Sequence, residues 1–259
     1  MSDIIECPSG LSGRIKYLAA EAAGVLGNAR ELRTGHAADR ILNSCWVETT
    51  NAGPYILDSQ GKLNWDRVLS CDKTYLLVMI RVETFGESYE LDLRCPGCTN
   101  KFVWDVPLSQ LPMRLLPAAS RNAIAMGTNK FETALRDGRK VWFRLMDGLD
   151  QLRALKVIRE NSTDLVTASL QTRVLEVENV KARDLPKFLA ELSMGDVESL
   201  ISSFDEIDGG IETSIEVFCQ GCQYEWEIEL PLDLQAMFAP SKLRRKRQRA
   251  KQAQGQTQT

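Results

Sequence analysis

Two segments of the chain alternate apolar and polar residues with the two-residue period of a β-strand. Each segment has a short alternating run that is followed, after several residues, by a longer one. The apolar positions are Leu91, Leu93, Phe102, Trp104 and Val106 in the first segment, and Ile215, Val217, Tyr224, Trp226, Ile228 and Leu230 in the second. This spacing places the apolar side chains of each run on one face, so each segment is predicted to form two strands.

A pair of cysteines in the pattern Cys-x-Gly-Cys separates the two runs of each segment. The pairs are Cys95 with Cys98, and Cys219 with Cys222. The two copies are offset by 124 residues and align without a gap, so they form an internal repeat. Each copy is predicted to be a hairpin whose tip presents two thiols, with Gly97 and Gly221 supplying the permissive backbone of a tight turn.

Four thiols from two facing hairpins are the ligand set of a closed, structural zinc site. We therefore predict that zinc is bound by Cys95, Cys98, Cys219 and Cys222. The 120 residues between the pairs exceed the roughly 15–20 usual in such motifs, so this interpretation requires an inserted domain. Disulfides and redox chemistry stay open as alternatives, although a redox Cys-x-x-Cys normally opens a helix and both copies here continue into strands.

Between the cysteine pairs the periodicity changes from strand to helix. Residues 130–146 predict a hairpin around an Asp137-Gly138 turn, and residues 149–208 predict helices, with Asp184 as a cap. Two stripes have i, i+3, i+4, i+7 spacing: Leu185, Phe188, Leu189 and Leu192, then Val197, Leu200, Ile201 and Phe204. Such stripes are typical of helix faces that pack in a core, although they also suit partner binding.

The N-terminal part predicts a strand over residues 11–18, helical segments up to about residue 32 and over 37–46, and a helix over 65–83. The whole pattern predicts an α+β fold with a β-rich, zinc-ribbon-like body of two knuckle hairpins that is discontinuous in sequence. We expect this body to comprise residues 1–113 and 207–240. Residues 114–206 are expected to form a hairpin-plus-helical insertion, and residues 241–259 a basic, disordered tail.

Composition narrows the function classes. With 44% hydrophobic and 26% charged residues the chain is an ordinary globular protein, and its longest apolar run, residues 75–80, is shorter than the ~18 residues of a membrane span. No secretion signal is recognisable, so we expect a cytoplasmic protein. Of the seven cysteines, Cys7, Cys45 and Cys71 fall outside the repeat and are expected to be buried core thiols.

Charge divides the chain unevenly. Residues 241–259 contain seven Lys or Arg and no acid, whereas residues 1–240 contain 25 basic and 35 acidic residues. No base-reading motif is present, so contact with nucleic acid is expected only non-specifically, through the tail. A single histidine, and the absence of a phosphate loop, nucleophile elbow or deaminase signature, argue against an enzyme.

The order of features resembles the baseplate hub assembly family of contractile-tailed phages of the T-even type. The resemblance is carried by Tyr75-Leu-Leu-Val-Met-Ile-Arg81, by Phe85-Gly86, by the two cysteine pairs, and by Gly209-Gly-Ile211, Leu230-Pro-Leu232 and Phe238-Ala-Pro240. It implies a non-catalytic structural or assembly protein that binds other hub or wedge proteins. Such a protein is made in the host cytoplasm, and it either stays in the virion tail baseplate or acts only during assembly. The alternative is a nucleic-acid-binding zinc-ribbon protein that uses its basic tail.

Overall fold

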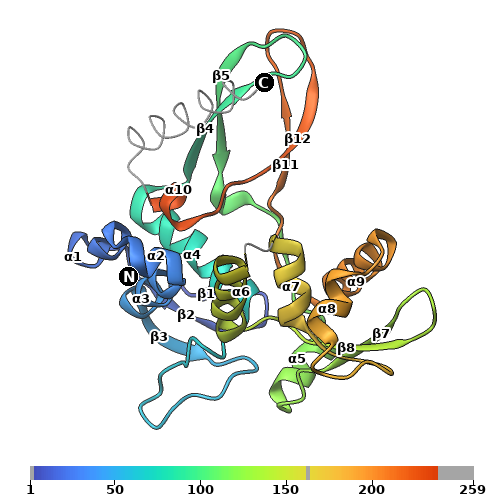
Figure 1. Ribbon diagram of the computed structural model, residues 1–259. Helices are drawn as coiled ribbons and strands as arrows, with labels where there is room; N and C mark the ends of the chain where they lie inside the picture. The colour runs from blue at the N-terminus through green and yellow to red at the C-terminus, as the bar shows by residue number, and fades with distance from the viewer. Residues whose placement is uncertain (1–2, 162–163, 239–259) are drawn as a thin grey trace.

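The computed structural model describes residues 3–161 and 164–238 and has a mixed α+β architecture (Figure 1). The helices are α1 (Ala20–Ala23), η1 (Gly24–Gly27), α2 (Ala29–Thr34), α3 (His36–Cys45), α4 (Ser70–Phe85), η2 (Leu108–Gln110), α5 (Ala118–Ala125), α6 (Gly148–Asn161), α7 (Leu165–Arg173), α8 (Leu185–Ala190), α9 (Met194–Ile207) and α10 (Leu234–Phe238). None of the helices in these two ranges is long and apolar enough to cross a membrane. The predicted basic tail lies outside the described residues.

The strands form small antiparallel sheets. They are β1 (Ile5–Glu6), β2 (Ser12–Ile15), β3 (Trp46–Asn51), β4 (Ser88–Arg94), β5 (Lys101–Pro107), β6 (Met113–Arg114), β7 (Phe131–Ala134), β8 (Lys140–Phe143), β9 (Val174–Val177), β10 (Gly210–Ile211), β11 (Ser214–Phe218) and β12 (Glu225–Glu229). The three-stranded sheets have the orders β1-β2-β3 and β7-β8-β9, and the two-stranded ones are β4-β5, β11-β12 and β10-β6. The predicted α+β class is confirmed.

Helix α4 lies at the centre of the largest hydrophobic cluster, which also takes in α3, the bases of β4 and β5, and α10. The helix ends at Phe85, two residues beyond the predicted end, and it begins at Ser70 and not near residue 65. The later start of the helix is explained by hydrogen bonds to a distant part of the chain. The N–H groups of Ser70, Gly148 and Leu149 link residues 66–70 to residues 146–149, which uses the backbone groups that a longer helix would need.

A second cluster, the helical cluster, is built from β7, β8, β9 and α7–α9 and contains both predicted stripes except Ile201. Of the eight stripe residues only Ile201 is well exposed, at 38%. One detail of the prediction is wrong. Residues Val174–Val177 form a strand paired with β8, because Val174 and Val177 bury their side chains in this cluster. Asp184 is the N-cap residue of α8, as predicted, although its side chain makes no capping hydrogen bond.

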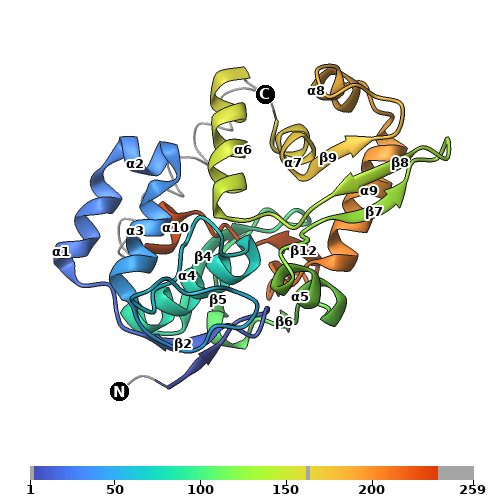
Figure 2. The same ribbon diagram turned by 90° about the horizontal axis from the view of Figure 1, so that it is seen from below.

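The two passages of the chain between the hairpins and the helical cluster lie side by side. Strand β6 pairs with β10, so Met113 lies opposite Ile211. Helix α6 packs against the N-terminal helices at Gly35 (φ +87°). The side chains of Leu152 and Leu155 lie so close there that a Cβ atom would not fit. From below, α1–α4 lie on one side of α6, and α7–α9 with β7–β9 lie on the other (Figure 2).

Candidate metal centre

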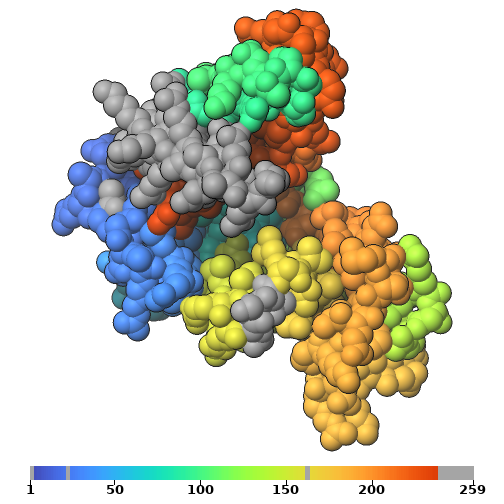
Figure 3. All heavy atoms as spheres, turned by 45° about the horizontal axis from the view of Figure 1, so that its top comes forward, coloured from blue at the N-terminus to red at the C-terminus, as the bar shows by residue number. Residues whose placement is uncertain are grey.

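The hairpins β4-β5 and β11-β12 repeat one another in register as well as in sequence. Leu93 lies opposite Phe102 in the first hairpin, and Val217 lies opposite Trp226 in the second. Both pairs are related by the same offset of 124 residues that relates the cysteines. The hairpin tips meet at the end of the molecule farthest from the helical cluster, where their surfaces are adjacent (Figures 1 and 3).

The two turns have the same hydrogen bonds. The N–H of Thr99 donates to the carbonyl of Cys95 (2.9 Å), and that of Gln223 donates to the carbonyl of Cys219 (2.8 Å). The left-handed residues are Thr99 (φ 60°) and Gln223 (φ 59°), so the prediction that Gly97 and Gly221 supply the permissive conformation is wrong. From the sequence, Thr99 and Gln223 can be recognised as equivalent positions of the repeat. Their left-handed conformation cannot be predicted, because neither threonine nor glutamine favours a positive φ.

The glycines serve close approach between the hairpins instead. A Cβ atom on Gly97 would lie 3.3 Å from Cγ of Tyr224, and one on Gly221 would lie 3.5 Å from Nδ2 of Asn100. Asn100 and Tyr224 are themselves equivalent positions of the repeat. The two knuckles therefore contact one another through an approximate two-fold relation, with each glycine under a side chain of the opposite turn.

The four cysteines of the repeat converge at this contact. Their sulfur atoms all lie within 4.8 Å of one another. The Sγ atoms of Cys95 and Cys222 are 3.6 Å apart, as are those of Cys98 and Cys219. Four sulfurs bound tetrahedrally at about 2.3 Å from a zinc ion lie about 3.8 Å from one another. The spacing is therefore compatible with a metal site, whereas a disulfide requires about 2.05 Å.

Burial and charge at the cluster suit a cation. Cys95 and Cys219 are buried, while Cys98 and Cys222 are exposed, and all four thiols are free. Burial raises the pKa of the Cys219 thiol, but hydrogen bonds from the N–H groups of Cys222 and Gly221 and from the neighbouring thiols outweigh it and lower that pKa to about 6. The pKa of Cys222, which shares the hydrogen bonds between thiols, is raised to about 12. Thiolates this close repel one another unless a cation lies between them, which is how structural zinc is held.

Aromatic side chains pack between the two hairpins beneath the sulfurs. Phe102 meets Trp226 edge to face with ring centroids 6.0 Å apart, and Trp104 meets Phe218 in the same way at 5.0 Å. These residues remain partly exposed, Phe218 by 43%. Apolar burial at the tips is therefore incomplete, and the sulfur cluster is a second contact between the hairpins.

The remaining cysteines lie elsewhere and are buried, as the sequence predicts. Burial raises the pKa of Cys7 and Cys71 well above the usual thiol range, and that of Cys45 to about 11. Uncharged, enclosed thiols are poor nucleophiles. They are core side chains.

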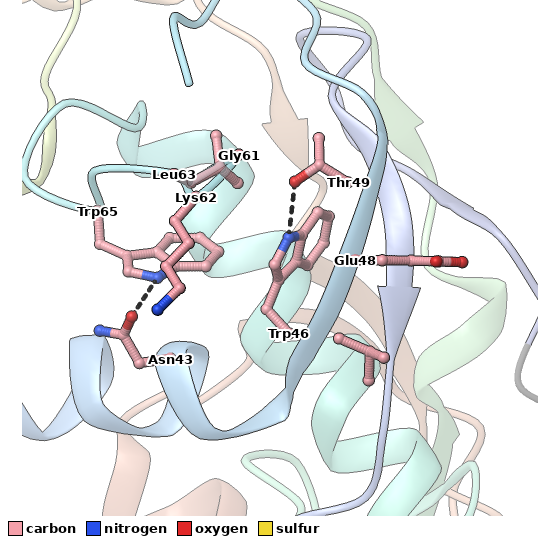
Figure 4. Close-up of a pocket in the computed structure, with 9 residues that line it drawn as sticks. Asn43, Trp46, Glu48, Thr49, Gly61, Lys62, Leu63 and Trp65 are labelled. Atoms are coloured by element: carbon pink, nitrogen blue, oxygen red, sulfur yellow. Dashed lines mark hydrogen bonds between the residues drawn. The ribbon is translucent and has the colours of Figure 1, made fainter. Parts of the chain in front are cut away.

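A separate hollow of about 180 Å³ lies between β3 and residues 61–65 (Figure 4). Its main walls are Trp46 and Trp65, whose rings meet edge to face at 5.9 Å. Both indole N–H groups are used within the protein, by Thr49 and Asn43, each at 3.0 Å. The two indoles therefore tie the loop before α4 to α3 and β3, while Glu48 and Lys62 also line the hollow.

Small antiparallel sheets, helices in a separate cluster and a four-cysteine contact between two hairpins define a mixed α+β protein with a zinc-ribbon-like body. The chain belongs to the family of T4 bacteriophage base plate proteins, whose family model matches residues 21–239. It is thus a phage baseplate protein, which confirms the resemblance seen in the sequence at the level of the family. It has no significant match among curated proteins or among solved structures.

Proposed function

We propose that the chain is a non-catalytic structural or assembly protein of the baseplate hub, and that one zinc ion clamps its two hairpins. Membership of the baseplate family supports the first part. The observation that carries the second is the cluster of Cys95, Cys98, Cys219 and Cys222 within 4.8 Å. Four thiolates complete the tetrahedral coordination of a zinc ion and leave no position for a substrate. This is the coordination of structural zinc and not of catalytic zinc.

In this proposal the zinc links two parts of one body, residues 1–113 and 207–240, across the inserted residues 114–206. The pairing of β6 with β10 supports this division, because it lies where the chain passes into the insertion and returns from it. The separate hydrophobic clusters on the two sides also support it. Some contacts cross the division: α6 packs against Gly35, and a third, small hydrophobic cluster joins Leu69 and Cys71 to Leu116 and Leu145.

The partners in this proposal are other hub or wedge proteins, met in the host cytoplasm during assembly and, for a retained subunit, in the virion tail. Co-purification of the tagged chain with individual hub and wedge subunits tests this directly. We expect a stoichiometric complex with at least one of them. If the correctly folded, zinc-containing chain binds none, the hub assignment is wrong, whatever the metal does.

The zinc proposal has its own test. Purified protein should contain about one zinc per chain, and Cys219→Ser should contain almost none. Cys45→Ala is the matched control, because Cys45 is equally buried but lies outside the cluster. Its zinc content should equal that of the parent.

A further inference from the structure

A groove runs between α7 and α9 on the surface of the helical cluster. Its rims carry Leu165, Val166 and Ile201, which are exposed by 71%, 44% and 38%. Its floor is formed by Leu170 and Phe204, which are almost fully buried. Three large apolar side chains exposed around one hollow are unusual for a surface without a partner.

The size of the hollow, about 240 Å³, suits side chains better than a free ligand. Pockets for small molecules usually measure about 300–1,000 Å³. The lining residues of α7 follow one another at intervals of a helical turn, as do those of α9, so the hollow is a groove between two helices. Such grooves bind the apolar face of a third helix, whose anchors are spaced by three or four residues.

The exposed charges on α7 and α9, the two helices that form the groove, are acidic. Helix α9 contains Asp196, Glu198, Asp205 and Glu206 and no basic residue. Helix α7 contains a single basic residue, Arg173, at its C-terminal end. Arg173 is only 8% exposed, and its Nη2 donates to Asp208 at 3.1 Å, so it does not offset the exposed acids.

Arg173 also holds the floor of the groove in place. Its guanidinium lies over the ring of Phe204, 4.3 Å from the centroid, and its Nε donates to the carbonyl of Arg144 at 3.1 Å. These contacts join α7, α9 and the end of β8, so the floor needs no rearrangement before a partner binds. A rigid floor lowers the entropic cost of association.

We propose that the α7–α9 groove binds an amphipathic α-helix with Lys or Arg beside its apolar face, contributed by another baseplate protein. The apolar side chains of that helix enter between Leu165 and Ile201, and its cations face Glu198 and Asp205. The identity of the partner as a baseplate protein rests on the proposed function. The groove and its charge do not.

The test uses the full chain and two synthetic helical peptides with the same apolar face, one with Lys and one with Glu at every polar position. Fluorescence anisotropy should show that the Lys peptide binds, that added salt weakens it, and that the Glu peptide binds at least tenfold more weakly. The double variant Leu165→Asp, Ile201→Asp should lose at least tenfold in affinity for the Lys peptide. The control is Met126→Asp, whose side chain is 77% exposed but outside the groove, and it should bind like the parent.

Each other outcome overturns the proposal. Failure of both peptides to bind, equal binding of both, or equal binding by parent and double variant removes the cationic helix as occupant. A dimer in sedimentation that the double variant abolishes shows that a second copy fills the groove instead. Zinc content and melting temperature of every variant are measured alongside, so a failed groove remains distinct from a failed zinc clamp.

Discussion

The hairpin pair, residues 88–107 and 214–229, and the helical cluster are held together in different ways. In the helical cluster Val141, Phe143 and Leu170 are at most 1% exposed. At the hairpin tips Phe218 and Tyr224 remain 43% and 47% exposed, and four sulfur atoms lie within 4.8 Å of one another. One region is stabilised by apolar burial, which needs no ligand. The other brings four thiols together at a spacing that is compatible with a bound metal ion.

This difference means that the two regions should respond to different perturbations. Loss of metal should loosen the hairpins and leave the helical cluster intact, while a cavity in the helical cluster should do the reverse. The predictions below test that separation, and their expected effects become progressively smaller.

Removal of one sulfur ligand should have the largest effect. Cys219→Ser should lose zinc and lower the melting temperature by more than about 10 °C, because structural zinc contributes many kcal/mol to folding. Hydrogen exchange should accelerate in residues 88–107 and 214–229 and remain slow in α9. A variant that keeps its protected hairpins without metal would break the comparison.

A cavity in the helical cluster should cost less and act elsewhere. Phe204 packs against Phe143, with ring centroids 4.9 Å apart, and is 3% exposed. Phe204→Ala should destabilise the chain by about 3–5 kcal/mol in denaturant titration. Phe204→Leu, which keeps most of the volume, should cost much less. Zinc content should stay at one per chain in both, and a loss of zinc would show that the regions are coupled.

The two glycines of the repeat allow a sharper comparison between the hairpins themselves. Gly97→Val should weaken zinc binding about tenfold, near 1.4 kcal/mol, because the added atoms press on the Tyr224 ring. Gly221→Val should weaken it less than threefold, since its nearest neighbour is the movable amide of Asn100. Competition with a chromogenic zinc chelator measures both affinities. The reverse ranking would contradict the contact described at the tips.

Deletion of the basic segment should have the smallest effect. A chain ending at Pro240 should keep its zinc and stay within about 0.5 kcal/mol of the parent stability, as surface changes usually do. Binding to duplex DNA, measured over a range of salt, should be weak and non-specific in the parent and lower in the shortened chain. Tight, sequence-dependent binding by the parent would favour the alternative function instead.

The sequence predicted the parts of the molecule that depend on local pattern. Alternation around the two cysteine pairs predicts the hairpins, and the constant offset of 124 residues predicts that they are equivalent. The stripes at residues 185–192 and 197–204 likewise predict α8 and α9, because an apolar face repeats at the helical period. The α+β class follows from these elements together.

What the sequence did not predict depends on contacts between distant residues. Val174 and Val177 become a strand only because β8 is available to pair with them. The left-handed backbone falls on Thr99 and Gln223, while Gly97 and Gly221 lie where the two knuckles touch, and that contact is set by residues of the opposite hairpin. Ile201 belongs to an apolar stripe whose other members are buried, so the sequence alone does not predict its exposure. The exposure follows from the position of α7, which lies beside it and leaves a groove.

The central claim is that a metal ion holds the hairpin pair together. Zinc analysis combined with X-ray absorption spectroscopy at the zinc edge tests it most directly. We predict one zinc per chain surrounded by four sulfur atoms at about 2.3 Å. A folded chain without zinc, or a zinc ion with nitrogen or oxygen ligands in place of sulfur, would contradict it.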